Sequence, residues 1–350
     1  MKTLSKLICI LILAIALTPG ISAAQNINLK NDSAHLLLDT VLSFTKHNSL
    51  YRNKVDWKKV EDSVRLTAAN AVTVKDVIPS VKLLYKLLGD HHGFITYNNK
   101  SYGWRGNDKP VDPATHQVLL KKIKTEYTLM PRILEKGFGY LLVPDNNPTH
   151  PGDVNKIARQ IQDSLIKLEP QKLKGLIIDL RLNPGGDMWA MIGGLITLFE
   201  PDKLGAFVFP VSNTEEAWGV KNNMVYDGID TAYIQKQPAK SLYNLKVVVL
   251  IGPYTRSSGE ATVISFKGRK NTLFIGENSG GYTTSNNSFQ FTNEIGFFLA
   301  TSVEADRNGH VYPDNIQPDL EVLGGDNFDD LKKDEKIITG LKWLKEKINK

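Results

Sequence analysis

The sequence predicts a two-part α/β protein, in which a short helical unit precedes a larger domain of alternating strands and helices. Between residues 33 and 88 the apolar residues recur at spacings of three and four, which is typical of amphipathic helices. Beyond residue 137, short runs rich in Val, Ile and Leu alternate with helical patterns, and such alternation indicates an α/β domain. A polar stretch, Asn98 to Pro113, lies between the two patterns and marks the predicted boundary.

The chain begins with the layout of a secretory signal peptide. Lys2 and Lys6 precede an apolar run from residue 7 to 17, which is followed by Pro19-Gly20 and the small residues 22–24. The run is about eleven residues long, against the roughly 20 that a membrane-spanning helix needs, so cleavage near Ala24 is favoured over a retained anchor. We expect residues 1–24 to be removed. The mature protein is then expected to lack a membrane-spanning helix and to lie in the periplasm or outside the cell.

Composition excludes several kinds of chemistry. The single cysteine, Cys9, lies in the predicted signal peptide, so the released protein has no disulfide, no thiolate metal site and no cysteine nucleophile. Loss of Lys2 and Lys6 lowers the formal net charge from +6 to +4, and the remaining basic residues alternate with acidic ones. This balance does not indicate a nucleic-acid-binding protein.

The helical N-terminal unit is assigned to residues 25–105. Its first apolar stripe comprises Leu37, Leu38, Val41 and Leu42, and its second comprises Val81, Leu84, Tyr85 and Leu88. Gly89 supplies a stop for the second helix. The sequence Asp90-His91-His92 follows at once, so a histidine pair is predicted just beyond a helix end.

The larger domain is assigned to residues 106–350. Strands are predicted at residues 138–143, 176–180, 247–251 and 273–275, with helices at 154–168, 188–198 and 258–266. Two further strands, at 288–291 and 296–303, precede a closing amphipathic helix from about residue 328 to 348.

Two strand-turn-helix segments of this domain could carry chemistry. In the first, a buried-type strand from Gly175 ends in the turn Asn183-Pro184-Gly185-Gly186. Glycines in such a turn can direct backbone amides at an oxyanion, or can simply form a tight connection.

In the second segment, the strand at 247–251 leads through a turn to Thr255-Arg256-Ser257-Ser258-Gly259-Glu260. A serine at a strand-to-helix junction can be an exposed nucleophile. It can equally cap the helix, with Glu260 completing a capping box.

Together these segments resemble the C-terminal processing (tail-specific) serine protease family. Two later pieces, residues 275–281 and 309–319, match it in the same order, and the resemblance runs from about residue 139 to 322. It implies a crotonase-like (ClpP/crotonase) α/β core, with a nucleophile three residues before the glutamate, which selects Ser257 over Ser258. It also implies an oxyanion site made by the backbone amides of Gly186 and Ser258.

The resemblance implies two alternatives for the general base. Many bacterial members use a lysine twenty-five residues after the serine, but Tyr282 stands at that position here. Tricorn-type and nisin-resistance-type members, which lack an inserted peptide-binding domain, use a histidine in an Asp-x-His pattern, and Asp90-His91-His92 fits it. His92 is therefore the candidate base, since an imidazole of pKa near 6.5 suits proton exchange at neutral pH. The alternative is a histidine that only interacts with the helix end.

A third residue that orients the imidazole stays open. Glu304, Asp306 and Glu260 are candidates, although each could be an ordinary surface or capping charge. Position 91 is His where tricorn-type sites have Ser. Neither a metal nor a cofactor is predicted, because adjacent histidines lack the spacing of a helical zinc pair and no phosphate-loop or dinucleotide pattern occurs.

The sequence thus predicts a serine peptidase that acts on peptide or protein substrates. No more than 46 residues separate His92 from the strand at 138–143, too few for an inserted peptide-binding domain, so substrate selection is expected to rest on the cleft. The alternatives are a non-catalytic binding protein on the same fold and an unrelated hydrolase such as an esterase. The sequence predicts no oligomeric state.

Overall fold

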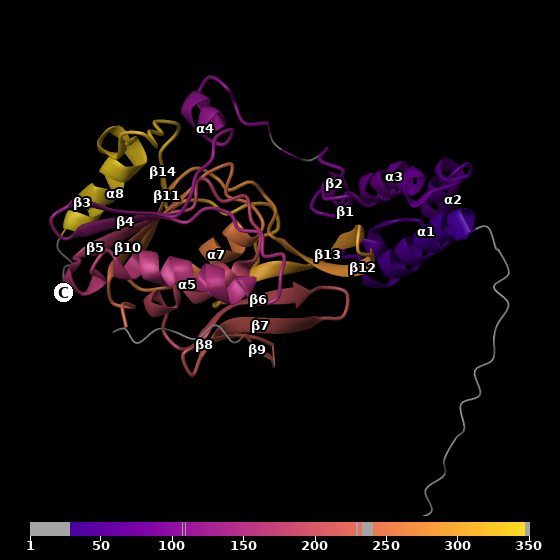
Figure 1. Ribbon diagram of the computed structural model, residues 1–350. Coiled ribbons are helices and arrows are strands. Elements are labelled where there is room, and N and C mark those ends of the chain that lie inside the picture. The colour runs from indigo at the N-terminus through magenta and orange to yellow at the C-terminus, as the bar shows by residue number, and fades with distance from the viewer. Residues whose placement is uncertain (1–28, 107, 109, 229, 233–240, 347–350) are drawn as a thin grey trace, which may run out of the picture.

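The computed structural model of the protein describes residues 29–106, 108, 110–228, 230–232 and 241–346. The predicted signal peptide, residues 1–24, lies outside this part of the chain. A mixed α/β body with two sheets adjoins a smaller helical unit, and a long hairpin joins the two (Figure 1).

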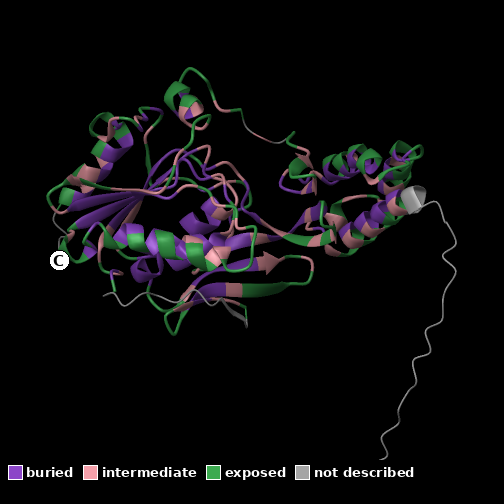
Figure 2. Cartoon of the chain, viewed as in Figure 1, coloured by how far each residue is buried: buried purple, intermediate pink, exposed green. Residues whose placement is uncertain are grey.

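Three helices form the N-terminal unit: α1 (Leu29–Asn48), α2 (Trp57–Thr67) and α3 (Ile78–Leu88). Both predicted apolar stripes are buried in one cluster, which also takes in Ile295, Phe297 and Leu299 from a strand late in the chain. Gly89 ends α3 with a φ of 75°, a left-handed conformation that glycine adopts without strain. The outer faces of these helices are exposed (Figure 2).

The same unit contains a small strand pair, β1 (Phe94–Tyr97) and β2 (Lys100–Gly103). β1 also pairs antiparallel with β13 (Ile295–Asp306), for example Phe94 opposite Phe298. Part of the stretch predicted as a polar boundary is therefore a strand. The segment after α3 is built into a sheet shared with the larger domain.

The second sheet of six strands has the order β14-β11-β10-β5-β4-β3. Its central strands β4, β5, β10 and β11 are parallel, as buried apolar runs predict. Helices α5, α6 and α7 share an apolar core with one face, and α8 packs on the other. The strands are β3 (Met130–Glu135), β4 (Phe138–Leu142), β5 (Gly175–Asp179), β10 (Lys246–Ile251), β11 (Thr272–Gly276) and β14 (Leu320–Glu321).

Of the remaining helices, α5 and α7 agree with prediction, α6 ends four residues earlier than predicted, α4 was not predicted, and α8 begins later than predicted. They are α4 (Gln117–Lys122), α5 (Asp153–Ile166), α6 (Met188–Gly194), α7 (Ser258–Phe266) and α8 (Glu335–Lys345). α8 begins seven residues later than predicted, because the carboxylate of Asp334 caps it by accepting from the Ile337 amide. Short 3-10 turns are η1 (Arg52–Lys54), η2 (Val74–Val77), η3 (Pro170–Lys172), η4 (Ile196–Leu198) and η5 (Leu331–Lys333).

The first sheet contains eight strands and was largely missed by the sequence prediction. Its order is β2-β1-β13-β6-β7-β8-β9, with β12 also paired to β13. Of these strands, the sequence predicted β12 and β13, both shorter than they are. The others here are β6 (Lys203–Phe209), β7 (Thr214–Lys221), β8 (Met224–Asp227), β9 (Asp230–Ala232) and β12 (Thr284–Thr292).

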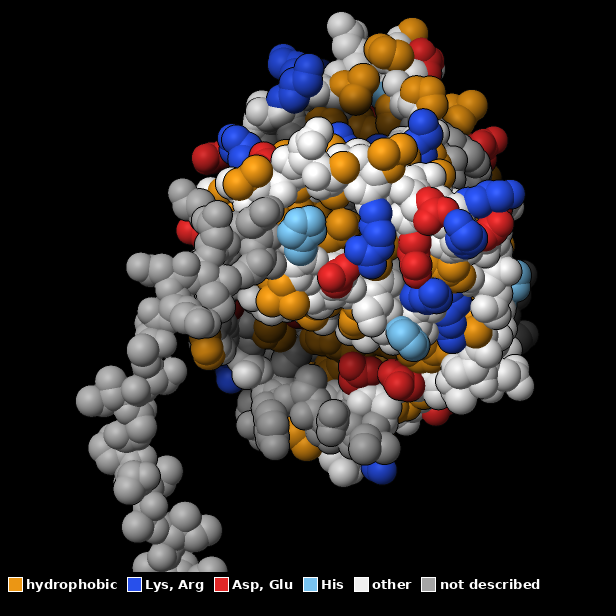
Figure 3. All heavy atoms as spheres, turned by 90° about the vertical axis from the view of Figure 1, so that its right-hand side faces the viewer, with side chains coloured by type: hydrophobic (Ala, Val, Ile, Leu, Met, Phe, Trp, Pro, Cys, Tyr) orange, Lys and Arg blue, Asp and Glu red, His pale blue; other side chains and the backbone are white. Residues whose placement is uncertain are grey.

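The face formed by the N-terminal unit carries charges of both signs side by side (Figure 3). Lys46 pairs with Glu61 and Arg65 with Asp39, both across helices. Within the described residues, no helix is long and apolar enough to cross a membrane.

Candidate active site

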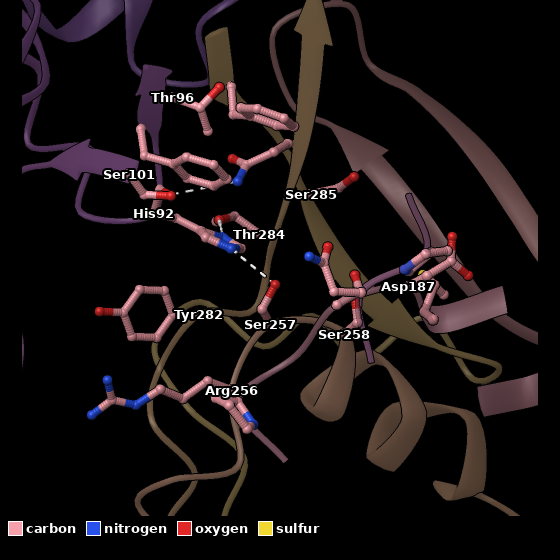
Figure 4. A pocket seen from close by; sticks show the side chains of 18 of the residues that line it. His92, Thr96, Ser101, Asp187, Arg256, Ser257, Ser258, Tyr282, Thr284 and Ser285 are labelled. Atoms are coloured by element: carbon pink, nitrogen blue, oxygen red, sulfur yellow. Dashed lines mark hydrogen bonds between the residues drawn. The ribbon is translucent and has the colours of Figure 1, made fainter. Parts of the chain in front are cut away.

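Ser257 and His92 face each other in a cavity of about 1030 Å³ between the two parts of the molecule (Figure 4). The cavity is lined by the segment after α3 and by β1 on one side, and by the turns before α6 and α7 on the other. Ser258, Tyr282 and Thr284 also line it. The structure thus brings together residues that lie 165 positions apart in the chain.

Ser257 stands in the sharp turn between β10 and α7. Its φ of 51° and ψ of −124° lie in a region that residues other than glycine rarely adopt. Such a strained strand-to-helix turn exposes a serine side chain above a sheet. The Oγ atom of Ser257 lies 3.0 Å from His92 Nε2, in hydrogen-bond contact.

The His92 imidazole is held on its other side by a hydroxyl group. His92 Nδ1 lies 2.7 Å from Thr284 Oγ1, on β12. His92 is 7% exposed, and its burial, with the nearby positive charges of His91 and Arg105, lowers the pKa of His92 to about 3. The imidazole is therefore neutral at physiological pH, the form that can accept a proton.

The backbone around His92 is fixed by two charged side chains. Asp90 Oδ1 accepts hydrogen bonds from the amides of His92 and Gly93, while Oδ2 accepts from the Ala300 amide of β13. Arg105 Nη1 donates to the carbonyl of His91 at 2.6 Å and to that of Gly93 at 3.2 Å. The aspartate of the Asp-x-His pattern therefore positions the main chain.

Glu260 holds the turn that carries Ser257. Its Oε2 accepts from the amides of Ser257 (2.9 Å) and Tyr282 (2.7 Å), and its Oε1 accepts from Ser279 Oγ (2.5 Å) and the Gly281 amide (2.9 Å). The side chain is fully buried, and burial raises its pKa to about 7 against the opposing effect of these bonds. Glu260 thus ties the Ser257 turn to the 279–282 loop.

Tyr282 stands twenty-five residues after Ser257, at the position where the resemblance to the tail-specific proteases suggested a lysine. Its ring packs edge-on against His92, with centroids 5.2 Å apart, and its hydroxyl donates to Asp108. It contributes a wall to the cavity and cannot replace a lysine as base.

The glycine turn, residues 183–186, lies directly against Ser257. A Cβ atom on Gly185 would lie 2.9 Å from Ser257 Cβ, and one on Gly186 would lie 1.8 Å from the Asn146 carbonyl. Asn183 fixes the turn, since its Oδ1 accepts from the Gly185 amide and its main-chain carbonyl accepts from the Arg256 amide. Among the described hydrogen bonds none uses the Gly186 or Ser258 amide, so both can donate to a ligand.

Behind this turn lies a buried charge cluster. Arg181, two residues before Asn183, pairs with Asp179 (2.6 Å), Asp326 (2.6 Å) and Asp334 (2.8 Å). Asp334 is also the cap of α8, so the ion pairs connect the closing helix to the end of β5. This cluster explains why an arginine precedes the turn.

The three candidate orienting carboxylates have different surroundings. Glu304 lines the cavity, whereas Asp306 accepts from Tyr312 Oη and from two amides of its own turn, and Glu260 is occupied as described. Within the described residues none of the three is hydrogen-bonded to the His92 ring. Sequence reasoning missed Thr284 and Arg105, and the only signal for Thr284 was its place two residues after Tyr282. The described residues contain no group of three or more His, Cys, Asp or Glu arranged to hold a metal ion.

Comparison with known proteins supports one family. Residues 137–322 match peptidase family S41. A nisin-resistance protein from Lactococcus lactis subsp. lactis is 24% identical over 274 residues, 78% of either chain.

Two solved structures share the fold. A lipoprotein from Streptococcus agalactiae superposes with a TM-score of 0.67 at 20% identity, covering 95% of this chain and 99% of that one. The photosystem II D1 C-terminal processing protease gives a TM-score of 0.52 at 14% identity, covering 83% and 93%. The family match extends over more than half of the sequence and includes both the glycine turn and the Ser257 turn, and on this ground the chain belongs to peptidase family S41.

Proposed function

We propose that this peptidase is of the serine type and cleaves peptide bonds through an acyl-enzyme, with Ser257 as nucleophile and His92 as general base. The observation that carries the proposal is the 3.0 Å contact between Ser257 Oγ and His92 Nε2 inside a cavity large enough for a peptide segment. A serine that only capped its helix would not need a buried imidazole beside it.

The geometry supports a sequence of steps. With its proton on Nδ1 directed at Thr284, His92 accepts the Ser257 proton at Nε2 as the serine oxygen attacks a peptide carbonyl. The amides of Gly186 and Ser258 stabilise the oxyanion that forms. His92 then gives its proton to the leaving amine. In the second half of the reaction His92 accepts a proton from a water molecule, which attacks the acyl group and releases it from Ser257, and His92 returns the proton to Ser257 Oγ.

For the wider architecture we propose a crotonase-like core at residues 106–350 and a helical unit at residues 25–105 that supplies His92. We propose that Thr284, which bonds His92 Nδ1, orients the imidazole in place of the three candidate carboxylates Glu304, Asp306 and Glu260.

We place the protein outside the cytoplasm, either in the periplasm or in the extracellular medium. The signal-like residues 1–24 support this, as do the names of two relatives, a nisin-resistance protein and a lipoprotein. Exported peptides or proteins are then its substrates.

Replacement of Ser257 by Ala tests the proposal. The Ser257→Ala protein should lose peptide hydrolysis and labelling by a fluorophosphonate probe while it keeps the thermal unfolding temperature of the wild type. Ser288→Ala, which removes an exposed hydroxyl on β12, is the matched control and should retain activity. Activity that survives in Ser257→Ala would exclude this nucleophile. A wild-type protein that binds peptides without cleaving them would indicate a binding protein, and one that turns over only small esters would indicate an esterase.

A further inference from the structure

Glu304 is a buried carboxylate in the active-site cavity that the proposed catalytic steps do not use. It lies on β13, where its amide donates to the Thr283 carbonyl at 3.0 Å and its carbonyl accepts from the Tyr312 amide at 3.1 Å. In the strand register it stands directly opposite Phe207 of β6. The sheet therefore fixes the position of this side chain closely.

The carboxyl group of Glu304 lacks the partners that buried acids normally have. The residue is 3% exposed, and its Oε2 atom has no hydrogen-bond partner in the described structure. No ion pair to Glu304 is found among the described residues, and the nearby charge that acts on it is the like charge of Glu260. An unpaired buried carboxyl destabilises a fold, so its presence needs an explanation.

The cavity around Glu304 combines this acid with apolar walls. Met188 and Phe207 line the same cavity, together with Gly186 and Ser258 of the proposed oxyanion site. A long side chain could pack its aliphatic part on Met188 and Phe207 and present a charged end to the carboxyl group.

We propose that Glu304 forms the base of a specificity pocket that accepts a lysine or arginine side chain of the substrate, at the residue before or after the scissile bond. This inference rests on the proposed peptidase function and adds a substrate class to it. The ammonium or guanidinium group would supply the hydrogen bonds that Oε2 lacks.

Protonation is consistent with this role. Burial, followed by the nearby Glu260, raises the pKa of Glu304 well above its ordinary value. The carboxyl group is then neutral until a cation lies beside it, and pairing with the cation favours the ionised form. Binding of a cationic side chain should therefore release a proton.

The test uses peptides that differ only at the residue before or after the scissile bond, with Lys, Arg, Met, Gln or Glu at each place. The wild type should cleave the Lys and Arg peptides with a kcat/KM about tenfold or more above that of the Gln peptide at one of the two places. Glu304→Gln should abolish this preference and leave kcat/KM for the Met and Gln peptides within about twofold. Glu294→Gln, which changes an exposed carboxylate on the rim of the same cavity, is the matched control and should keep the preference.

Three kinetic results would overturn the inference. The first is a wild type that does not prefer Lys or Arg on either side of the scissile bond. The second is a preference for Lys or Arg that persists in Glu304→Gln. The third is a uniform fall in kcat of Glu304→Gln for all peptides, which would assign Glu304 to positioning of His92. Binding of the Lys and Gln peptides to Ser257→Ala, measured by calorimetry, separates this inference from the proposed function, because it needs no turnover. Equal affinity for both peptides would refute the pocket even if the peptidase activity is confirmed.

Discussion

The buried carboxylate of Glu260 offers a quantitative test of how the Ser257 turn is held. Glu260→Gln keeps the size of the side chain but replaces one acceptor oxygen by an NH2 group. In either orientation of the amide, the NH2 group faces two hydrogen-bond donors. These are the Ser257 and Tyr282 amides at one position, or Ser279 Oγ and the Gly281 amide at the other.

The expected change in stability has two parts. Two buried donors left without acceptors cost about 1–3 kcal/mol each, or about 2–6 kcal/mol in all, at any pH at which Glu260 is ionised. The second part depends on pH. Because the folded-state pKa is raised from 4.5 to about 7, the stabilisation from protonated Glu260 is fully present below pH 4.5 and is lost as the pH rises through 7. This loss amounts to about 3 kcal/mol, and Gln, which does not titrate, cannot show it.

Equilibrium urea unfolding between pH 4.5 and 8 measures both parts. As the pH rises across this range, the wild type should lose about 3 kcal/mol of unfolding free energy relative to Glu260→Gln. Peptidase activity of the variant should fall as well, since the Ser257 amide loses its anchor. Glu216→Gln, at an exposed position of β7, is the control and should give a flat difference.

A difference that stays constant within about 1 kcal/mol between pH 4.5 and 8 would show that the pKa of Glu260 is not raised. A Glu260→Gln protein with wild-type stability and activity would refute the assigned role altogether.

Three further predictions concern the base and the oxyanion turn. Burial and the positive charges of His91 and Arg105 lower the pKa of His92 to about 3, so the fall of kcat/KM that accompanies protonation of His92 should occur below pH 5. Arg105→Gln should move this fall to higher pH. A fall near pH 6.5 that belongs to His92 in the wild type would contradict the prediction. Thr284→Val removes the hydroxyl at His92 Nδ1 and should lower kcat about tenfold or more with little change in KM. Thr284→Ser keeps a hydroxyl and should have a kcat close to that of the wild type. Equal kcat values for the two variants would exclude an orienting role of Thr284. Gly186→Ala places a Cβ atom 1.8 Å from the Asn146 carbonyl oxygen at a φ of 114°, so it should destabilise the fold by about 2 kcal/mol or more and abolish activity. Gly309 has a φ of 83° and no atom within 4 Å of the added Cβ. Gly309→Ala should therefore lower the folding stability, measured by thermal unfolding, by only about 1 kcal/mol.

Local sequence patterns predicted those elements whose boundaries are set by neighbouring residues. The strand at 247–251 and the helix at 258–266 match β10 and α7, because a β-branched run, a turn and a capping glutamate all lie within a few residues of one another. Strands β6 to β9 were missed, since their apolar residues do not alternate regularly, as in β7, where three exposed residues precede three buried ones. β2 was taken for part of the polar boundary between the two units, because its residues are mostly polar and only the pairing with β1 makes it a strand.

The site shows the same division between local and distant information. Ser257 and His92 could be proposed because each belongs to a short motif with a recognisable context. Thr284 and Arg105 could not, because each acts on the histidine from a separate segment, Thr284 from 192 positions away. The isolated carboxyl of Glu304 became visible only with its burial and its missing partners.

The hairpin that joins the two parts of the molecule also determines the stage of chain synthesis at which the proposed active site can form. Phe94 of β1 pairs with Phe298 of β13, and His92 reaches Thr284 and Ser257 from the opposite end of the chain. A chain that ends between residues 257 and 294 has both His92 and Ser257 but lacks residues 295–298 of β13, with which β1 of the helical unit pairs. During synthesis the proposed pair of Ser257 and His92 therefore cannot assemble until most of the chain, up to about residue 298, has been made.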